Sequence, residues 1–197
     1  MNDWNADDGD LWIHLSLTDP DAAEWLSLHS ELDSAAIESL LAVESRPRVT
    51  RVANGALIAF RGVNLNEGAT PDDMIGIRVW LDEHRVVSTE RRGLRSVGDV
   101  VDGLAKGEGP TSATEVITEL ARRLVSRMSD TVDNLEEQIA DLEDQTLNDT
   151  KRETRFALAN LRRQLIALRR YLAPQREALA SFLTLKFPWL TDNDRLL

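Results

Sequence analysis

The sequence contains no cysteine among its 197 residues, which excludes disulfide bonds, thiol catalysis and thiolate metal sites. Its three histidines, His14, His29 and His84, lack the paired spacing of metal ligands such as H-x-x-x-H. A self-contained tetrahedral zinc site is therefore not expected. The sequence also has no apolar run approaching the ~20 residues that cross a bilayer. The nearest stretch, 181–190, is short and includes Lys186 and Pro188, so we expect no membrane-spanning segment here.

Positive charge is scarce as well. The chain has 34 Asp and Glu residues against 23 Lys and Arg, which gives a formal net charge of −11. This balance argues against nucleic acid as a partner, because binding phosphate requires a basic face. It is compatible with attracting cations, although many acidic proteins have no such role. The N-terminus lacks the basic stretch and apolar segment of a signal peptide, so a cytoplasmic chain is expected.

Alternating hydrophobicity predicts strands in the first half of the chain. In residues 11–17, every second side chain is apolar, which places Leu11, Ile13, Leu15 and Leu17 on one face. Residues 48–65 are predicted to form a hairpin, because Asn54-Gly55 is typical of a tight type I′ turn in which both central residues have positive φ. Two further strands are predicted at 74–81 and 85–90.

Helices are predicted between and after these strands. Thr18-Asp-Pro-Asp21 indicates a helix start. A second helix is expected from about Ser34 to Glu44, with Ile37, Leu40 and Leu41 on one face, and a third from Ser96 to Lys106. The sequence therefore predicts an α/β (α+β) fold class for residues 1–110, with a mixed β-sheet layered with helices.

Residues 111–190 are predicted to form a long antiparallel helical hairpin. Thr111-Ser112 with Glu115 is a capping box, and apolar residues then recur every three or four positions to about Leu147. Asn148-Asp149 is a plausible turn. The returning helix alternates spacings of three and four between Leu158 and Phe182, which is the pattern of a coiled-coil seam. A short connection requires the two helices to run antiparallel.

The two predicted helices carry opposite charges. Between positions 115 and 149 there are ten acidic and three basic residues, and between 150 and 180 two acidic and eight basic ones. Each exposed pair gains only a few tenths of a kcal/mol, but the contrast helps to specify this pairing. It also argues against nucleic acid or anionic lipid as the partner of the basic helix. Pro174 removes the backbone bond to the carbonyl of Arg170 and should kink the second helix.

Few residues offer chemistry. We interpret His14, beside Trp12 in a strand, as a hydrogen-bonded packing histidine. Asp82-Glu83-His84 could ligate a metal together, but polar residues at a hairpin tip favour turn chemistry. The acidic pairs Asp7-Asp8 and Asp72-Asp73 are available to cations and are equally explained as solvated loops. Without a glycine-rich phosphate loop, nucleophile elbow or metal dyad, no catalytic residue, no organic cofactor and no enzyme activity are predicted. The metal ligands stay unassigned.

One stretch resembles a known family. Residues 161–179, with Arg169-Arg170-Tyr171 and Pro174-Gln175-Arg176, resemble the signature helix of ZntB-type members of the CorA superfamily of metal-ion transporters. The residues 12–15, Asp19-Pro20 and Pro188-Trp189-Leu190 are similar to the same family. The resemblance covers nearly the whole chain.

The resemblance implies a homopentamer in the inner (plasma) membrane. Its cytoplasmic domains would form a funnel below a pore built from two C-terminal membrane helices per subunit. A divalent cation, zinc or magnesium, would be the transported or regulatory ion, and ZntB-type members handle zinc. In such proteins a long stalk helix follows the 188–190 loop, and 191–197 looks like its start. We therefore expect a cytoplasmic funnel domain with a regulatory or assembly role, which does not transport alone and meets the membrane only through C-terminal helices absent from this sequence. Self-association is expected to be weaker in this fragment.

A second interpretation stays open at this point. A free-standing adaptor or scaffold protein, whose helical hairpin binds another helix, would show the same periodicity. Two apolar segments of ~20 residues beyond Leu197 would favour the transporter.

Overall fold

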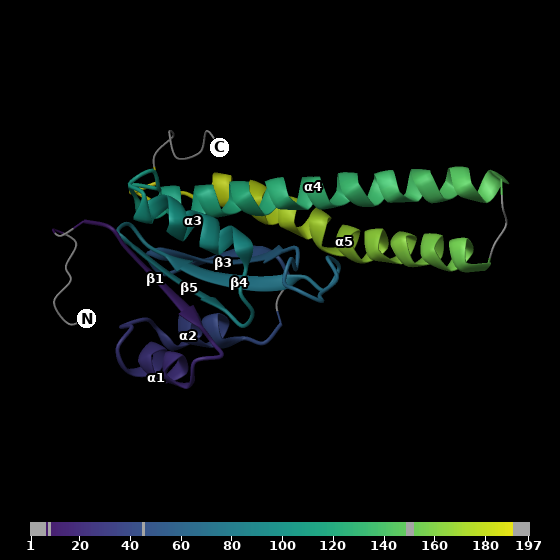
Figure 1. Ribbon diagram of the computed structural model, residues 1–197. Coiled ribbons are helices and arrows are strands. Elements are labelled where there is room, and N and C mark those ends of the chain that lie inside the picture. The colour runs from purple at the N-terminus through teal and green to yellow at the C-terminus, as the bar shows by residue number, and fades with distance from the viewer. Residues whose placement is uncertain (1–6, 8, 45, 149–151, 191–197) are drawn as a thin grey trace.

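The computed structural model describes residues 7, 9–44, 46–148 and 152–190. A five-stranded sheet has helices on both faces, and two long helices continue well beyond the edge of the sheet (Figure 1). The elements along the chain are β1 (Leu11–Ser16), α1 (Pro20–Leu28), α2 (Ser34–Leu41), β2 (Arg48–Val52), β3 (Gly55–Gly62), β4 (Ile75–Leu81), β5 (Arg85–Glu90), α3 (Arg95–Ala105), α4 (Ala113–Asn148) and α5 (Arg152–Thr184). The predicted fold class is confirmed.

The sheet is mixed, as the sequence predicts. Its strand order is β1-β5-β4-β3-β2. β1 runs parallel to β5, with Ile13 opposite Val87, and the other neighbours are antiparallel. β4 therefore lies in the middle of the sheet, and six of its seven residues are buried.

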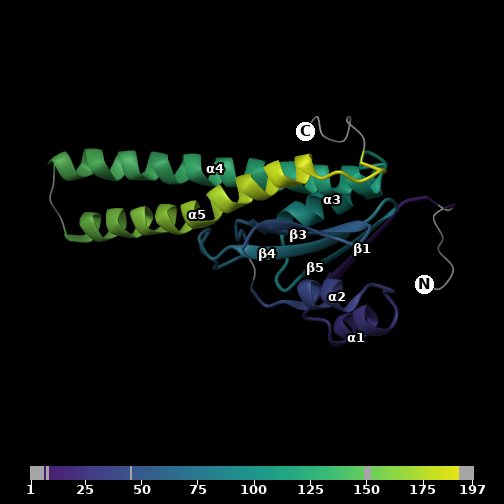
Figure 2. The same ribbon diagram turned by 180° about the vertical axis from the view of Figure 1, so that it is seen from behind.

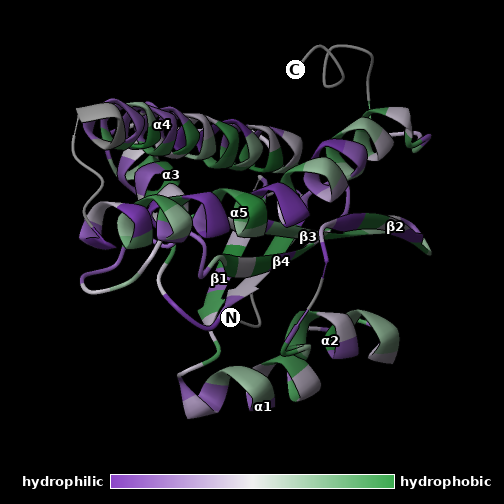
Figure 3. Ribbon diagram, turned by 90° about the vertical axis from the view of Figure 1, so that its right-hand side faces the viewer, coloured by the Kyte–Doolittle hydropathy of each residue, from purple (hydrophilic) through white to green (hydrophobic). Residues whose placement is uncertain are grey.

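Each face of the sheet packs against its own set of helices, as the end-on view in Figure 3 shows. On one face, Ile77, Val79 and other alternate residues form a core with side chains of α3, α4 and α5. On the other face, Trp80, Val87 and Ile13 pack against Leu26 of α1 and Leu40 of α2, among others. A third cluster continues between α4 and α5 beyond the sheet, built from Val63, Met74, Met128, Leu135 and Leu168.

The predicted type I′ turn at Asn54-Gly55 is wrong. The two-residue loop is Ala53-Asn54, because Gly55 already pairs with Val52 in the ladder. Ala53 has a positive φ of 46°, whereas Asn54 does not, a combination that a type I′ turn excludes. Gly55 is needed for a different reason. A Cβ at this position would lie 2.5 Å from the carbonyl oxygen of Leu81 on the neighbouring strand, so packing inside the sheet decides its identity.

Helix starts follow local capping chemistry, with one shift. The Asp19 carboxylate, and not Thr18, caps α1 by accepting a hydrogen bond from Asp21 N at 3.0 Å. At the start of α4, the Ser112 hydroxyl accepts from Glu115 N at 3.2 Å, and the Glu115 carboxylate accepts from Thr111 N at 2.7 Å. Ser112 is therefore the cap residue, as one half of the predicted capping box requires, whereas the Glu115 carboxylate bonds to Thr111 N in place of Ser112 N.

α2 ends at Leu41, three residues before its predicted end at Glu44. Ala42 has an extended ψ of 134°, which takes the chain out of the helix. Donors from the sheet meet the helix end instead: the Thr89 hydroxyl donates to Leu40 O at 2.7 Å. Tertiary hydrogen bonds thus terminate α2, and no local sequence signal announces them.

The helical hairpin is antiparallel, as predicted (Figures 1 and 2). Its seam is most buried near the sheet, where Leu124, Met128 and Leu168 are enclosed, whereas Ile139 and Leu158 farther out are only half-buried. Pro174 lies inside α5, and Figure 2 shows that the part of this helix over the sheet runs at an angle to its outer part. The predicted turn at Asn148-Asp149 and the predicted cap at 191–194 fall wholly or partly outside the described residues.

Charge pairs contribute less to the hairpin than its apolar seam does. Arg162 on α5 donates to Glu143 on α4 at 2.6 Å, but both side chains are largely exposed and the pair is screened by water. Two arginines of α4 itself pair with residues outside α5. Arg122 binds Glu119 on its own helix, and Arg127 binds Asp99 of α3.

This arrangement predicts unequal effects of two substitutions on α5. Leu168→Ala should lower the free energy of unfolding by roughly 2–5 kcal/mol, because Leu168 is only 1% exposed and its truncation leaves a cavity. The exposed Arg163→Ala should cost less than about 1 kcal/mol. Urea unfolding measures both, and equal losses would show that the apolar seam does not dominate the hairpin.

Candidate functional site

The signature stretch of α5 lies where the hairpin meets the sheet. Gln175 is only 3% exposed, and its side-chain oxygen accepts a hydrogen bond from the backbone N of Arg61 at 2.8 Å. Pairing of β2 with β3 stops at Arg48 opposite Ala59, so the N–H of Arg61 lies beyond the last strand pair. Gln175 takes the place of the missing strand neighbour, which fixes the position of α5 along β3.

The side chain of Arg61 extends the same contact. Its guanidinium lies over the Tyr171 ring, 4.7 Å from the ring centroid, and Nη1 donates to Met74 O at 3.0 Å. Arg170 approaches the same ring at 5.9 Å. The motif that the sequence singled out thus supplies three side chains, Arg170, Tyr171 and Gln175, to a joint between α5, β3 and the residue before β4. We call this joint the sheet–hairpin junction.

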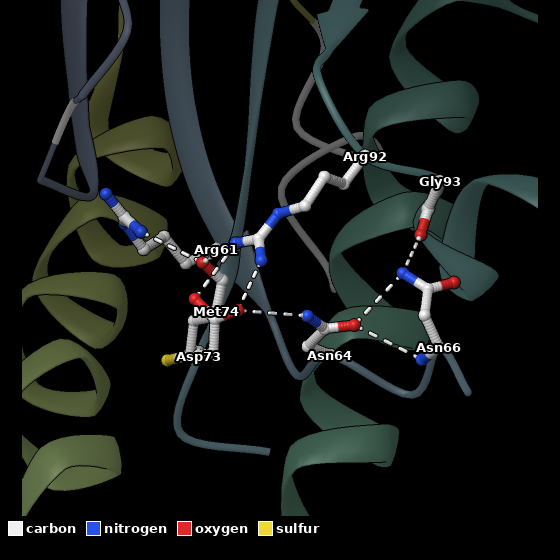
Figure 4. A network of polar contacts seen from close by, with 7 residues as sticks. All are labelled: Arg61, Asn64, Asn66, Asp73, Met74, Arg92 and Gly93. Atoms are coloured by element: carbon white, nitrogen blue, oxygen red, sulfur yellow. Dashed lines mark hydrogen bonds and ion pairs between the residues drawn. The ribbon is translucent and has the colours of Figure 1, made fainter. Parts of the chain in front are cut away.

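A polar network continues from the junction across the start of β4 (Figure 4). Arg92 forms an ion pair with Asp73 through both of its terminal nitrogens, and Asn64 Nδ2 donates to Asp73 Oδ2 at 3.4 Å. Asn66 then donates to Asn64 Oδ1 at 3.0 Å and to Gly93 O at 3.0 Å. The hydrogen bond from Arg92, more than any other contact, holds the pKa of Asp73 below its usual value. One carboxylate of the Asp72-Asp73 pair is therefore already engaged by an arginine.

His14 has partners that sequence reasoning missed. Its Nδ1 lies 2.8 Å from Ser88 Oγ, and its Nε2 lies 3.4 Å from Glu90 Oε1. The Trp12 ring nitrogen also donates to Ser88 Oγ at 2.8 Å. Ser88 has no exposed surface, so this serine, histidine and glutamate arrangement offers no nucleophile to a substrate. The interpretation of His14 as a hydrogen-bonded packing residue is confirmed. The sequence signal that could have identified these partners is the polar run Ser88-Thr89-Glu90 inside a buried strand.

The residues 82–84 serve a turn, as predicted. The Asp82 carboxylate accepts from His84 N at 3.1 Å and from Arg85 N at 2.7 Å. The His84 ring bonds to Asp10, with Nδ1 2.9 Å from Oδ1, and the other Asp10 oxygen accepts from Ala113 N at 2.7 Å. Asp10 thereby joins the β4–β5 turn to the first turn of α4. The hydrogen bond between the His84 ring and Asp10, together with the charges of Asp10, Glu83 and Asp82, raises the pKa of His84.

The loop that follows α5, residues 185–190, packs against the β2–β3 turn. Phe187 and Trp189 stack with ring centroids 4.7 Å apart, and the Trp189 ring nitrogen donates to Asn54 O at 3.2 Å. Arg51 lies over the Phe187 ring at 4.8 Å. With Trp25 of α1 and Leu11 of the edge strand β1, among others, this loop lines an open hollow of about 1090 Å³.

Within the described residues, no group of three or more His, Asp or Glu side chains is placed to hold a metal ion. His14, His29 and His84 do not meet there in one such group. Asp8 of the Asp7-Asp8 pair lies outside the described part of the chain. What the described geometry provides is a hydrogen-bonded and stacked connection between the sheet and α5.

Comparison with known proteins identifies relatives over nearly the whole chain. A family model described as CorA-like Mg²⁺ transporter protein matches residues 7–197. The zinc transport protein ZntB of Yersinia enterocolitica is 39% identical over 184 residues, which are 93% of this chain and 56% of that protein. The chain thus spans little more than half the length of this relative.

Solved structures agree with this result. The full-length CmaX protein superposes with a TM-score of 0.87 and 35% identity, covering 94% of this chain and 57% of that one. The ZntB cytoplasmic domain from Vibrio parahaemolyticus gives a TM-score of 0.79 and 25% identity, covering 91% of this chain and 71% of that one.

The sheet–hairpin junction leads to a prediction on stability. Gln175→Leu keeps the volume of the side chain but leaves the N–H of Arg61 without its acceptor, and should lower the free energy of unfolding by about 1–3 kcal/mol. The adjacent exposed Arg176→Gln should change it by less than about 0.5 kcal/mol. Urea denaturation tests both variants. If Gln175→Leu proved as stable as the parent chain, the hydrogen bond to β3 would not fix α5.

The His84–Asp10 pair leads to a prediction on pH. Because the pKa of His84 is raised in the folded state, its stabilising contribution is complete below the unfolded value of about 6.5 and is lost as the pH rises through the folded value. His84→Gln should therefore lower the melting temperature more at about pH 5.5 than at about pH 8.5. Thermal unfolding at both values tests this, with the exposed His29→Gln as the control. A pH-independent difference from the parent chain would contradict it.

Proposed function

The chain belongs to the CorA-like Mg²⁺ transporter family, and from this membership we propose that it is the cytoplasmic domain of a zinc transporter. It would take part in regulation and assembly and would not transport by itself. The observation that carries this proposal is the match to zinc transport proteins at 39% identity over 93% of the chain. The likeness to the ZntB cytoplasmic domain supports the cytoplasmic placement.

Passage through the membrane is assigned to other parts of the full-length protein. Within the described residues, no helix combines the length and the apolar character that spanning a bilayer requires. Since the chain spans 56% of the length of its ZntB relative, the proposal places the pore and the inner-membrane anchorage beyond Leu197. The protein would then be an inner-membrane protein with this domain in the cytoplasm.

The regulatory part of the proposal rests on how the hairpin is attached. The hydrogen bond from Arg61 N to Gln175 and the stacking of Arg61 on Tyr171 attach α5 to the sheet, so a shift of the sheet would move the hairpin with it. In a ring of subunits, a homopentamer in our proposal, a divalent cation held between carboxylates of neighbouring chains would favour one arrangement. Such a cation acts only through its different affinity for two arrangements. The same domain contacts would contribute to assembly.

Reconstitution tests the proposed function. The full-length protein that carries this domain should conduct zinc into vesicles loaded with a zinc-sensitive dye, whereas the 1–197 chain added alone should not. Magnesium flux measured in parallel separates the two cations. Magnesium flux without zinc flux would contradict the assignment of zinc, and the absence of flux for both cations would contradict the transporter.

A further inference from the structure

Three arginines gather on the face of the sheet that carries α1 and α2. Arg78 of β4 lies opposite Ala59 of β3 and Thr89 of β5, and the strand alternation turns Arg48 and Arg91 to the same side. The guanidinium of Arg61 lies over Tyr171 of α5 instead, but its charge also acts on Arg78. In a chain with a net charge of −11, such a concentration of positive charge requires an explanation.

The end of α2 accounts for part of it. Arg78 Nη2 donates to Val43 O at 2.7 Å, and Arg91 Nη2 donates to Leu41 O at 2.9 Å. Cations favour a helix C-terminus, where carbonyl groups lack partners and the helix dipole is negative. Each guanidinium therefore has one structural contact with the segment that ends α2.

These contacts leave most of the donors unused. Arg78 is only 3% exposed, and the Nε atoms of Arg78 and Arg91 are buried without a hydrogen-bond partner. In the described part of the chain, neither arginine forms an ion pair with a carboxylate. Burying a charge without a counter-charge is unfavourable.

The surrounding charges make the imbalance larger. Burial lowers the pKa of Arg78, and the charges of Arg61, Arg91 and Arg48 lower it further. Every charged group that acts on Arg78 in this way is thus a cation. None of the charges that act on Arg78 is therefore a counter-ion, and an anion at this place would supply one.

We propose that Arg78 and Arg91, with Arg48 at the exposed rim, bind a phosphate group at the end of α2. Guanidinium groups present paired N–H donors whose spacing matches the oxygens of phosphate, and charge-assisted bonds of this kind are strong. Gly76 stands next to the guanidinium of Arg78, with its missing Cβ 3.5 Å from Nη1, so no side chain of that residue covers the group. The group could be free phosphate or the phosphate of a nucleotide.

Calorimetry on the 1–197 chain at constant ionic strength, with chloride as the balancing anion, tests the proposal. Inorganic phosphate should bind saturably in the millimolar range or tighter, and Arg91→Gln should weaken it about tenfold. Arg48→Gln should weaken it less, because Arg48 is exposed. The matched control is Arg46→Gln, an exposed arginine two residues away that is not among the charges acting on Arg78.

A second arm distinguishes the sources of phosphate. If adenosine monophosphate binds with the same affinity as inorganic phosphate, the site recognises the phosphate group alone. If adenosine monophosphate binds more tightly, the site recognises a nucleotide. Arg78→Gln removes a cap of α2 and risks unfolding, so Arg91→Gln and Arg48→Gln decide the outcome. Absence of saturable binding of both ligands, or equal weakening by Arg46→Gln, would overturn the proposal. Neither result depends on cation transport.

Discussion

The burial of β4 on both faces is the constraint on which the rest of the structure depends. Ile77 and Val79 require apolar cover from one side, and Trp80 requires it from the other. The sheet must therefore lie between two helical layers. α1 and α2 are short and cover one face locally, whereas α4 and α5 cover the other and extend past it. The long hairpin is thus part of the same core as the sheet.

Polar groups at the margins of this core fix the positions of the helices along the strands. Apolar contacts alone would allow α5 to slide along β3, because burial depends little on register. The hydrogen bond from Arg61 N to Gln175 has one geometry and removes that freedom. On the opposite face, Thr89, Arg78 and Arg91 fix where α2 ends. In both places a strand meets a helix through donors that no neighbouring strand uses.

Local patterns were sufficient to predict much of the fold. The shared face of Ile75, Ile77, Val79 and Leu81, the cap at Ser112 and the seam of the hairpin all depend on residues close in sequence, and the structure confirms them. Contacts between distant segments could not be predicted in this way. The parallel pairing of β1 with β5 brings His14 to Ser88, and Asp10 reaches the first turn of α4 from about a hundred residues away.

The same difference between local patterns and contacts of distant segments applies to the candidate site. Residues 169–176 form a motif in the sequence, but the role of Gln175 depends on its contact with β3, which is distant in the chain. Asn-Gly is a strong local signal that predicts a turn at Gly55, whereas the close approach of the Leu81 carbonyl oxygen decides the identity of this residue. The arginines of the α2 face carry no local pattern at all, since they come from separate strands that only the sheet brings together.

The uneven burial along the hairpin has a mechanical consequence. Among the side chains of α4 that the structure describes, the enclosed seam positions end at Leu135, and the helix continues to Asn148, about 20 Å farther at 1.5 Å per residue. The base of the hairpin is thus clamped by the core, while the distal end is held by fewer apolar contacts. Such a body acts as a lever: a small sideways force at its far end produces a torque at the sheet, where Gln175 and Tyr171 receive it.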